Sequence, residues 1–303
     1  MNEESLAALR ARSPNPLHRW GIRPLPVDPE DHLGSGRLVP IADGRVHVDS
    51  LGQGPDILAL PGFAGTSRTW RAVAERLQNR YRLHRCDFLG YGLSDKPAGI
   101  DHSRIGQARQ IEQVLDALGL KSCILMCNSA SAAPALYAQF RTPRRFSAGI
   151  MVAPFVAPRR HTAFGLRLLR LPFARPVLKL LLGFRPMIVL ANHTGRSDPS
   201  GITPEIVDEQ YLPYGTPGIW ESIAAVGRHL SPAGLNGIVQ MNKIPTLVVW
   251  ASEDRAGDLA GTQRLLGGLA DVRFEVFDPC GHVIQEERPD DLTRVIAEFL
   301  AEI

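Results

Sequence analysis

The sequence contains little lysine, few aromatic residues and no paired cysteines. Only four of its 34 basic residues are lysines, a skew toward arginine that suggests a GC-rich genome and says nothing about function. No cysteine shows the C-x-x-C spacing of a metal-binding or redox motif, so neither a disulfide framework nor a zinc site is expected. The four cysteines are Cys86, Cys123, Cys127 and Cys280.

Long apolar runs are also absent. No stretch reaches the roughly 18 uninterrupted apolar residues of a transmembrane helix, and the nearest candidate, residues 164–190, is broken by prolines and basic residues. Residues 1–13 carry acids and arginines where a signal peptide has an apolar core. We therefore predict a cytoplasmic protein with reduced thiols. No nucleic-acid-binding module is recognisable, so nucleic acid is not expected as a partner.

Acidic residues are missing from one segment. Residues 141–196 hold eleven basic residues and no aspartate or glutamate, although the whole chain has a net charge of only +3. The simplest interpretation is a solvated cationic face. The alternatives are recognition of an anionic substrate or of an acidic acyl-carrier protein, and contact with an anionic membrane surface.

From residue 36 onward, short apolar runs alternate with helical stretches. Such alternation predicts an α/β fold with a doubly wound, mostly parallel sheet covered by helices on both faces. Two short strands around an Asp43-Gly44 turn precede the alternation. The later strand candidates are 57–60, 81–88, 123–127, 148–153, 246–250 and 273–277, and the helix candidates are 69–78, 103–118 and 132–140.

The alternation is interrupted once. Residues 1–33 are rich in proline and are predicted to form an N-terminal extension. Residues 34–155 and 242–303 are predicted to form the two parts of one sheet core. Residues 156–241 contain no convincing strand and are rich in leucine, arginine and proline, so they predict a helical lid inserted into that core.

The strongest chemical signal lies at Ser129. An apolar strand at 123–127 runs into this serine, and an alanine-rich helix follows. Cys127 and Ser131, two residues before and after it, are both small. A nucleophilic serine in a sharp strand-to-helix turn needs small neighbours at these positions, because larger side chains collide there. Ser129 is therefore a candidate nucleophile, and the plain alternative is a helix N-cap serine.

A serine nucleophile needs a base and an acid that orients the base. Asp254 follows the strand at 246–250, and His282 follows the strand at 273–277 behind Gly281. Ligands bind beyond the carboxyl ends of strands in open α/β sheets, and all three candidates lie there. The nearby acids Glu253, Asp258 and Asp278 compete with Asp254 for the same role.

These residues, in this order, resemble the α/β-hydrolase superfamily over roughly residues 36–303. The segment from Leu60 to Trp70 and the segment from Asp87 to Pro97 resemble two further sequence blocks of that superfamily. The resemblance implies a Ser129–His282–Asp254 triad and an oxyanion hole made by the backbone N–H groups of Phe63 and Ala130. It implies no metal and no organic cofactor. In the sequence itself, no glycine-rich phosphate-binding pattern follows the strand at 57–60.

The resemblance implies a serine hydrolase of a carboxylic ester or thioester that works through an acyl-enzyme on a small apolar acyl substrate. The Asn128-Ser129 pair resembles the same position in hydrolases that cleave carbon–carbon bonds in β-diketone or dienol-type substrates. Carbon–carbon bond hydrolysis is therefore the alternative function. A non-hydrolytic ligand-binding protein on this fold is a second alternative. Apolar residues of the insertion, among them Phe164, Phe173 and Phe184, are expected either to line the substrate cavity or to pack the insertion onto the core.

Overall fold

A computed structural model describes the whole chain except residues 1–5, 163, 165–170, 172, 174–175, 178, 181–182 and 231–233. Eight strands form one sheet in the order β1-β2-β4-β3-β5-β6-β7-β8. β2 pairs antiparallel with β1 and with β4, and all other pairs are parallel. The strands are β1 (Arg37–Ile41), β2 (Gly44–Gly52), β3 (Asp56–Leu60), β4 (Arg82–Cys86), β5 (Cys123–Asn128), β6 (Phe146–Val152), β7 (Thr246–Ala251) and β8 (Val272–Phe277).

This sheet confirms the predicted α/β architecture, and every predicted strand is present within a few residues of its expected ends. β4 stops at Cys86, two residues before the predicted end at Phe88. The chain leaves the sheet there because the next residue, Asp87, uses its side chain to accept backbone N–H groups from two loops.

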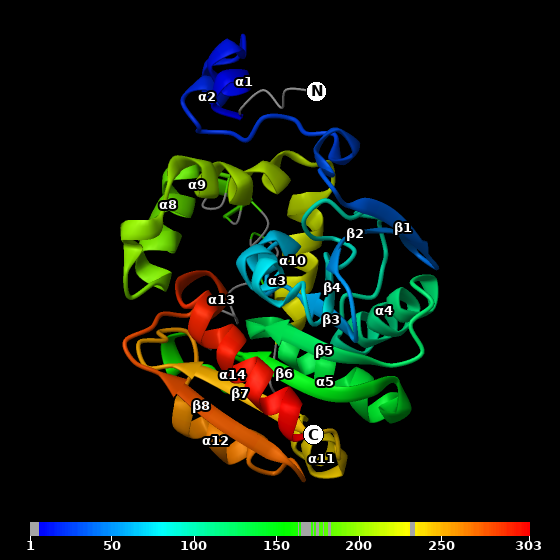
Figure 1. The fold of residues 1–303 in the computed structure, drawn as a ribbon. Coiled ribbons are helices and arrows are strands. Elements are labelled where there is room, and N and C mark those ends of the chain that lie inside the picture. Colours follow the sequence, from blue (N-terminus) through cyan, green and yellow to red (C-terminus); the bar gives the residue numbers. More distant parts are fainter. Residues whose placement is uncertain are drawn as a thin grey trace.

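Helices cover both faces of the sheet, as a parallel sheet requires. In Figure 1, α3 (Arg71–Leu77), α13 (Ile284–Glu287) and α14 (Pro289–Glu302) lie over one face. The other face packs against α4 (Arg104–Ala117), α5 (Ala132–Arg141), α11 (Asn236–Met241) and α12 (Leu259–Leu266). Alternate residues of β3 enter the two cores: Ile57 joins the α3 and α14 side, and Leu58 joins the α4 and α5 side.

Between β6 and β7 the chain forms α8 (Arg185–Gly195), α9 (Pro204–Tyr211) and α10 (Ile219–His229) before α11. The described residues of this insertion contain no strand, only an isolated bridge from Pro158 to Gly257. A separate apolar cluster holds the three helices together; it includes Ile188, Val207, Tyr211 and Ile223. Its function as a lid and the boundaries 156 and 241 stay predictions.

The N-terminal extension packs on these inserted helices. It contains the short helices α1 (Leu6–Arg12) and α2 (Pro16–Arg19), which lie next to α8 and α9 in Figure 1. Arg10 forms a 3.1 Å ion pair with Asp208 of α9, and the backbone N–H of Arg185 donates to the carbonyl of Gly21. Within the described ranges, no helix is long and apolar enough to span a membrane.

Candidate active site

Ser129 lies in the turn between β5 and α5, in a strained backbone conformation. Its φ of +54° is in the left-handed region, which non-glycine residues rarely adopt. The two small neighbours accommodate this turn: Cys127 is buried in β5, and the Ser131 hydroxyl donates a hydrogen bond to the carbonyl of Pro61. The turn therefore has the geometry of a nucleophile elbow, with serine and cysteine where glycines are usual.

His282 connects Ser129 to Asp254. The Nε2 atom of His282 lies 2.9 Å from the Ser129 hydroxyl, and Nδ1 lies 2.8 Å from Oδ2 of Asp254. Because an ionised carboxylate only accepts, Nδ1 carries the proton and Nε2 is left to accept the serine proton. The three residues come from the ends of β5, β7 and β8, so the structure brings together all three predicted side chains.

Asp254 is the buried acid of the group, with 1% of its surface exposed. Its Oδ1 accepts the backbone N–H groups of Ala256, at 2.7 Å, and Gly257, at 3.2 Å. Burial by itself raises the pKa of the Asp254 carboxyl. The hydrogen bond and charge of His282, together with the two backbone donors, lower it by more than burial raises it, so the pKa ends below its usual value. Asp254 therefore stays ionised beside His282 at neutral pH.

The competing acids have other partners. Asp258 caps α12 by accepting the backbone N–H of Gly261, and Asp278 accepts the hydroxyl of Ser252 at 2.5 Å. Glu253 is exposed. Of the four acids that the sequence left open, the structure places only Asp254 against His282.

The predicted oxyanion segment lies directly against the elbow. A Cβ atom on Gly62 would be 3.0 Å from the Asn128 side chain and 3.1 Å from Cβ of Ser129, so glycine allows this close approach without displacing either side chain. Phe63 and Ala130 both line the cavity beside Ser129. Ala64 has a φ of +54°, a second strained residue in the same segment.

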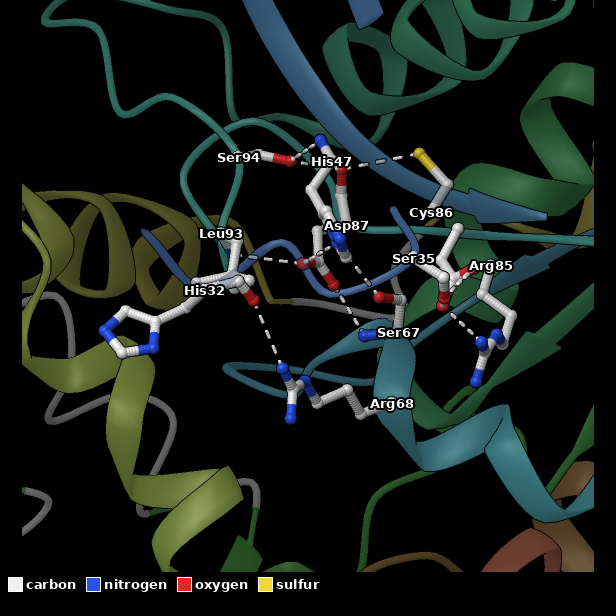
Figure 2. Close-up of polar contacts among 12 residues, drawn as sticks. His32, Ser35, His47, Ser67, Arg68, Arg85, Cys86, Asp87, Leu93 and Ser94 are labelled. Carbon is white, nitrogen blue, oxygen red and sulfur yellow. Dashed lines mark hydrogen bonds and ion pairs between the residues drawn. The ribbon is translucent and has the colours of Figure 1, made fainter. Parts of the chain in front are cut away.

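A buried aspartate anchors the far end of this segment. Asp87 accepts the backbone N–H groups of Ser67 and Leu93, and it contacts Nδ1 of His47 at 3.2 Å (Figure 2). Burial raises the pKa of Asp87, but the contacts with His47 and the two backbone donors outweigh burial, so the pKa lies below its usual value. Gly92 is required here, because a Cβ atom would lie 2.0 Å from the Asp87 carboxylate. The block from Asp87 to Pro97 is thus bonded to the predicted oxyanion segment through Ser67.

The site opens into a cavity of about 730 Å³ between the loops at the carboxyl ends of the strands and the inserted helices. Its apolar wall includes Ile188, Ala191, Ile206, Tyr214 and Leu230. The prediction that apolar residues of 164–184 line it, or pack onto the core, is wrong for those described. The five described ones are between 36% and 63% exposed and none of them lines the cavity: Phe164, Leu171, Phe173, Val177 and Phe184. The other candidates, Leu168, Leu169, Leu178, Leu181 and Leu182, lie outside the described residues.

The cavity also has polar lining residues, which could not be recognised in the sequence. Glu286, four residues after His282, accepts hydrogen bonds from Thr69 in the core and from Arg196 and Gln210 in the insertion. Its neighbour Glu287 accepts backbone N–H groups both from the insertion and from the loop that carries His282. These donors are Ser197 at 3.1 Å, Asp198 at 3.2 Å and Gly281 at 3.0 Å.

The histidine loop also bonds directly to the end of α8. The backbone N–H of His282 donates to the carbonyl of Gly195 at 2.8 Å. A Cβ atom on Gly281 would lie 2.4 Å from that carbonyl, so glycine is required. The loop that carries His282 is therefore packed directly against the insertion. In the part of the chain that the structure describes, no cluster of three or more His, Cys, Asp or Glu side chains is arranged to hold a metal ion.

A serine, a histidine and a buried aspartate that meet at three strand ends, beside a glycine-containing turn, are the arrangement typical of serine-nucleophile α/β enzymes. The sequence pattern of the alpha/beta hydrolase family matches residues 57–295, so the chain belongs to that family.

Its curated relatives include a dienoate hydrolase and a semialdehyde hydrolase. It is 28% identical over 284 residues to 2-hydroxy-6-oxo-6-phenylhexa-2,4-dienoate hydrolase of Comamonas testosteroni, covering 86% of this chain and 92% of that enzyme. It is 27% identical to 2-hydroxymuconate semialdehyde hydrolase of Pseudomonas putida, covering 90% and 97%. A solved meta-cleavage product hydrolase from Pseudomonas fluorescens superposes with a TM-score of 0.74 at 21% identity, over 89% of this chain and 99% of that one, which supports the fold.

Proposed function

We propose that this protein hydrolyses a carbon–carbon bond next to a carbonyl, in a β-diketone or dienol-type substrate, with Ser129 as nucleophile. The contact of Ser129 with His282, and of His282 with Asp254, is the observation that carries the proposal. The names of the relatives favour this bond over the ester or thioester that the sequence analysis preferred. Ester cleavage uses the same triad and is the second candidate.

The first half of the reaction forms an acyl-enzyme. His282 Nε2 takes the Ser129 proton while Oγ attacks one carbonyl carbon of the diketone. The backbone N–H groups of Phe63 and Ala130 hold the oxyanion, and losing one such donor typically costs about 10²–10³ in rate. When the tetrahedral adduct collapses, the carbon–carbon bond breaks. Its electron pair leaves as an enolate, which the second carbonyl stabilises and His282 protonates.

The second half releases the acyl group. Water, deprotonated by His282, attacks the acyl-Ser129 carbonyl through a second oxyanion, and Ser129 leaves with the proton that His282 returns. The products are one carboxylic acid and one ketone. Asp254 orients His282 and stabilises its charged form in both halves. The apolar wall around Ile188 and Tyr214 suits a small apolar acyl group.

The substrate test compares a β-diketone with a carboxylic ester that carries the same acyl group. The proposal predicts equal amounts of acid and ketone from the diketone, and a kcat/KM at least about tenfold higher than for the ester. Ser129→Ala is expected to abolish both reactions. A faster ester would restore the original preference. Tight binding without turnover, unchanged in Ser129→Ala, would select the non-hydrolytic binding protein.

The cationic insertion has no assigned partner in this proposal. The named substrates of the relatives are small molecules, and recognition of an acidic acyl-carrier protein by the basic residues of the insertion stays a prediction from charge alone. Charge reversal of Arg159 and Arg160 tests it, because only a carrier-bound substrate would then be used less well.

A further inference from the structure

The cavity wall contains three arginines, and a glutamate of the wall holds each of them. Glu209 of α9 accepts a hydrogen bond from Arg71 at 3.0 Å and lies 3.6 Å from Arg68. Arg71 is the first residue of α3, and Arg68 lies in the short turn of helix just before it. Deeper in the wall, Glu286 pairs with Arg196, whose side chain is only 7% exposed. In these pairs, the two carboxylates already occupy the positions that a substrate carboxylate would need.

The acids also outnumber the arginines. Among the described residues that line the cavity, Asp198, Glu209, Glu286 and Glu287 carry four negative charges, against three positive charges on Arg68, Arg71 and Arg196. With His282 neutral, the wall has a net charge of −1. An anion entering this cavity loses part of its hydration, meets a wall of like sign and has to displace a glutamate to gain a cation.

We propose that the cavity selects substrates without a carboxylate, so that the natural substrate is an uncharged β-diketone, and that Glu209 is the residue that enforces this choice. The inference rests on the proposed carbon–carbon hydrolysis and narrows its substrate class. It separates this chain from relatives whose named substrates are dienoates.

Of Glu209 and Glu286, Glu209 is the better position for a substitution that tests the proposal. Its side chain is 29% exposed and its arginines are 34% and 49% exposed, so the pairs lie at the cavity mouth and their loss leaves the fold intact. Figure 2 shows a further partner of Arg68, the backbone carbonyl of His32 at 3.3 Å, which keeps this arginine in place when Glu209 changes. Glu209→Gln thus frees two positioned guanidinium groups for a substrate carboxylate.

The test uses two benzoyl β-diketones that differ only at the far end, one with a carboxylate and the other with the isosteric carboxamide. Binding is measured calorimetrically on the Ser129→Ala protein, and turnover on the protein with Ser129. We expect the carboxamide to bind at least about tenfold more tightly. Glu209→Gln should shift the ratio about tenfold toward the carboxylate, and Arg71→Gln should shift it the other way.

Glu302→Gln is the matched control, because it makes the same change in total charge at an exposed position near the C-terminus. It should leave the ratio unchanged. Equal or tighter binding of the carboxylate by the Ser129→Ala protein overturns this inference, whatever the turnover shows. Preferential binding of the carboxamide without turnover by the unmodified enzyme supports the selection and overturns the proposed hydrolysis instead.

Discussion

The hydrogen bonds of Asp254 make a residue-scale prediction possible. Its Oδ1 is occupied by two backbone donors, which leaves Oδ2 in a fixed position for His282. In Asp254→Asn, an amide replaces the acceptor, and the imidazole loses both the tautomer and the charge stabilisation that the reaction needs. We expect kcat to fall roughly 10³–10⁴-fold with little change in the thermal midpoint.

Glu253→Gln is the control for this variant, since this neighbouring side chain is exposed. It should keep wild-type kcat. Asp254→Asn with activity within a factor of about three of the wild type would remove Asp254 from the triad.

At the scale of elements, the loop after β8 joins the sheet to the insertion through Glu287. This side chain accepts backbone N–H groups from Ser197, Asp198 and Gly281 and thereby fixes the end of α8 beside His282. Glu287→Gln removes the charge and half of the acceptors, which costs about 1–3 kcal/mol of docking free energy. We expect faster proteolytic cleavage near residues 195–201 and a lower kcat, measured side by side.

Glu275→Gln, in the middle of β8, is a matched control because its carboxylate pairs at the surface with Arg273. It should be cleaved at the wild-type rate. If Glu287→Gln also resists protease and retains full kcat, then Glu287 does not couple the insertion to the histidine loop.

The sheet, and the meeting of the three candidate side chains at its strand ends, could be predicted from the sequence for identifiable reasons. Strands such as β5 and β7 are apolar on both faces, and the candidates Ser129, Asp254 and His282 each follow a strand end in the expected chain order. The polar lining of the cavity could not be predicted, because Arg196 and Glu286 meet across 90 residues and nothing in their local sequence signals a partner. Apolar periodicity likewise could not show which face of the insertion meets the cavity, so Phe173 was wrongly assigned.

For the whole molecule, His102 links stability to pH. Its side chain is buried, and its Nδ1 has no hydrogen-bond partner among the described residues. Burial, reinforced by the charge of His229, lowers the pKa of His102 from 6.5 to about 4. The folded protein therefore binds fewer protons than the unfolded chain between these two values, and its stability falls as the pH falls through this window.

The prediction compares the free energy of unfolding of the wild type and His102→Gln, from urea titrations at about pH 7 and about pH 4.5. The wild type should lose about 2 kcal/mol more than the variant between the two conditions. His193→Gln, at an exposed position, is the control. An equal loss in the wild type and in His102→Gln would show that His102 does not contribute to acid destabilisation.

The central claim is that the strained turn and His282 make Ser129 an activated nucleophile. Intact mass after treatment with a serine-directed fluorophosphonate tests it most directly, on the wild type, Ser129→Ala and His282→Ala. We predict a single adduct on the wild type and none on either variant. A folded wild type that takes up no reagent, or a Ser129→Ala protein that is still labelled, would contradict the account.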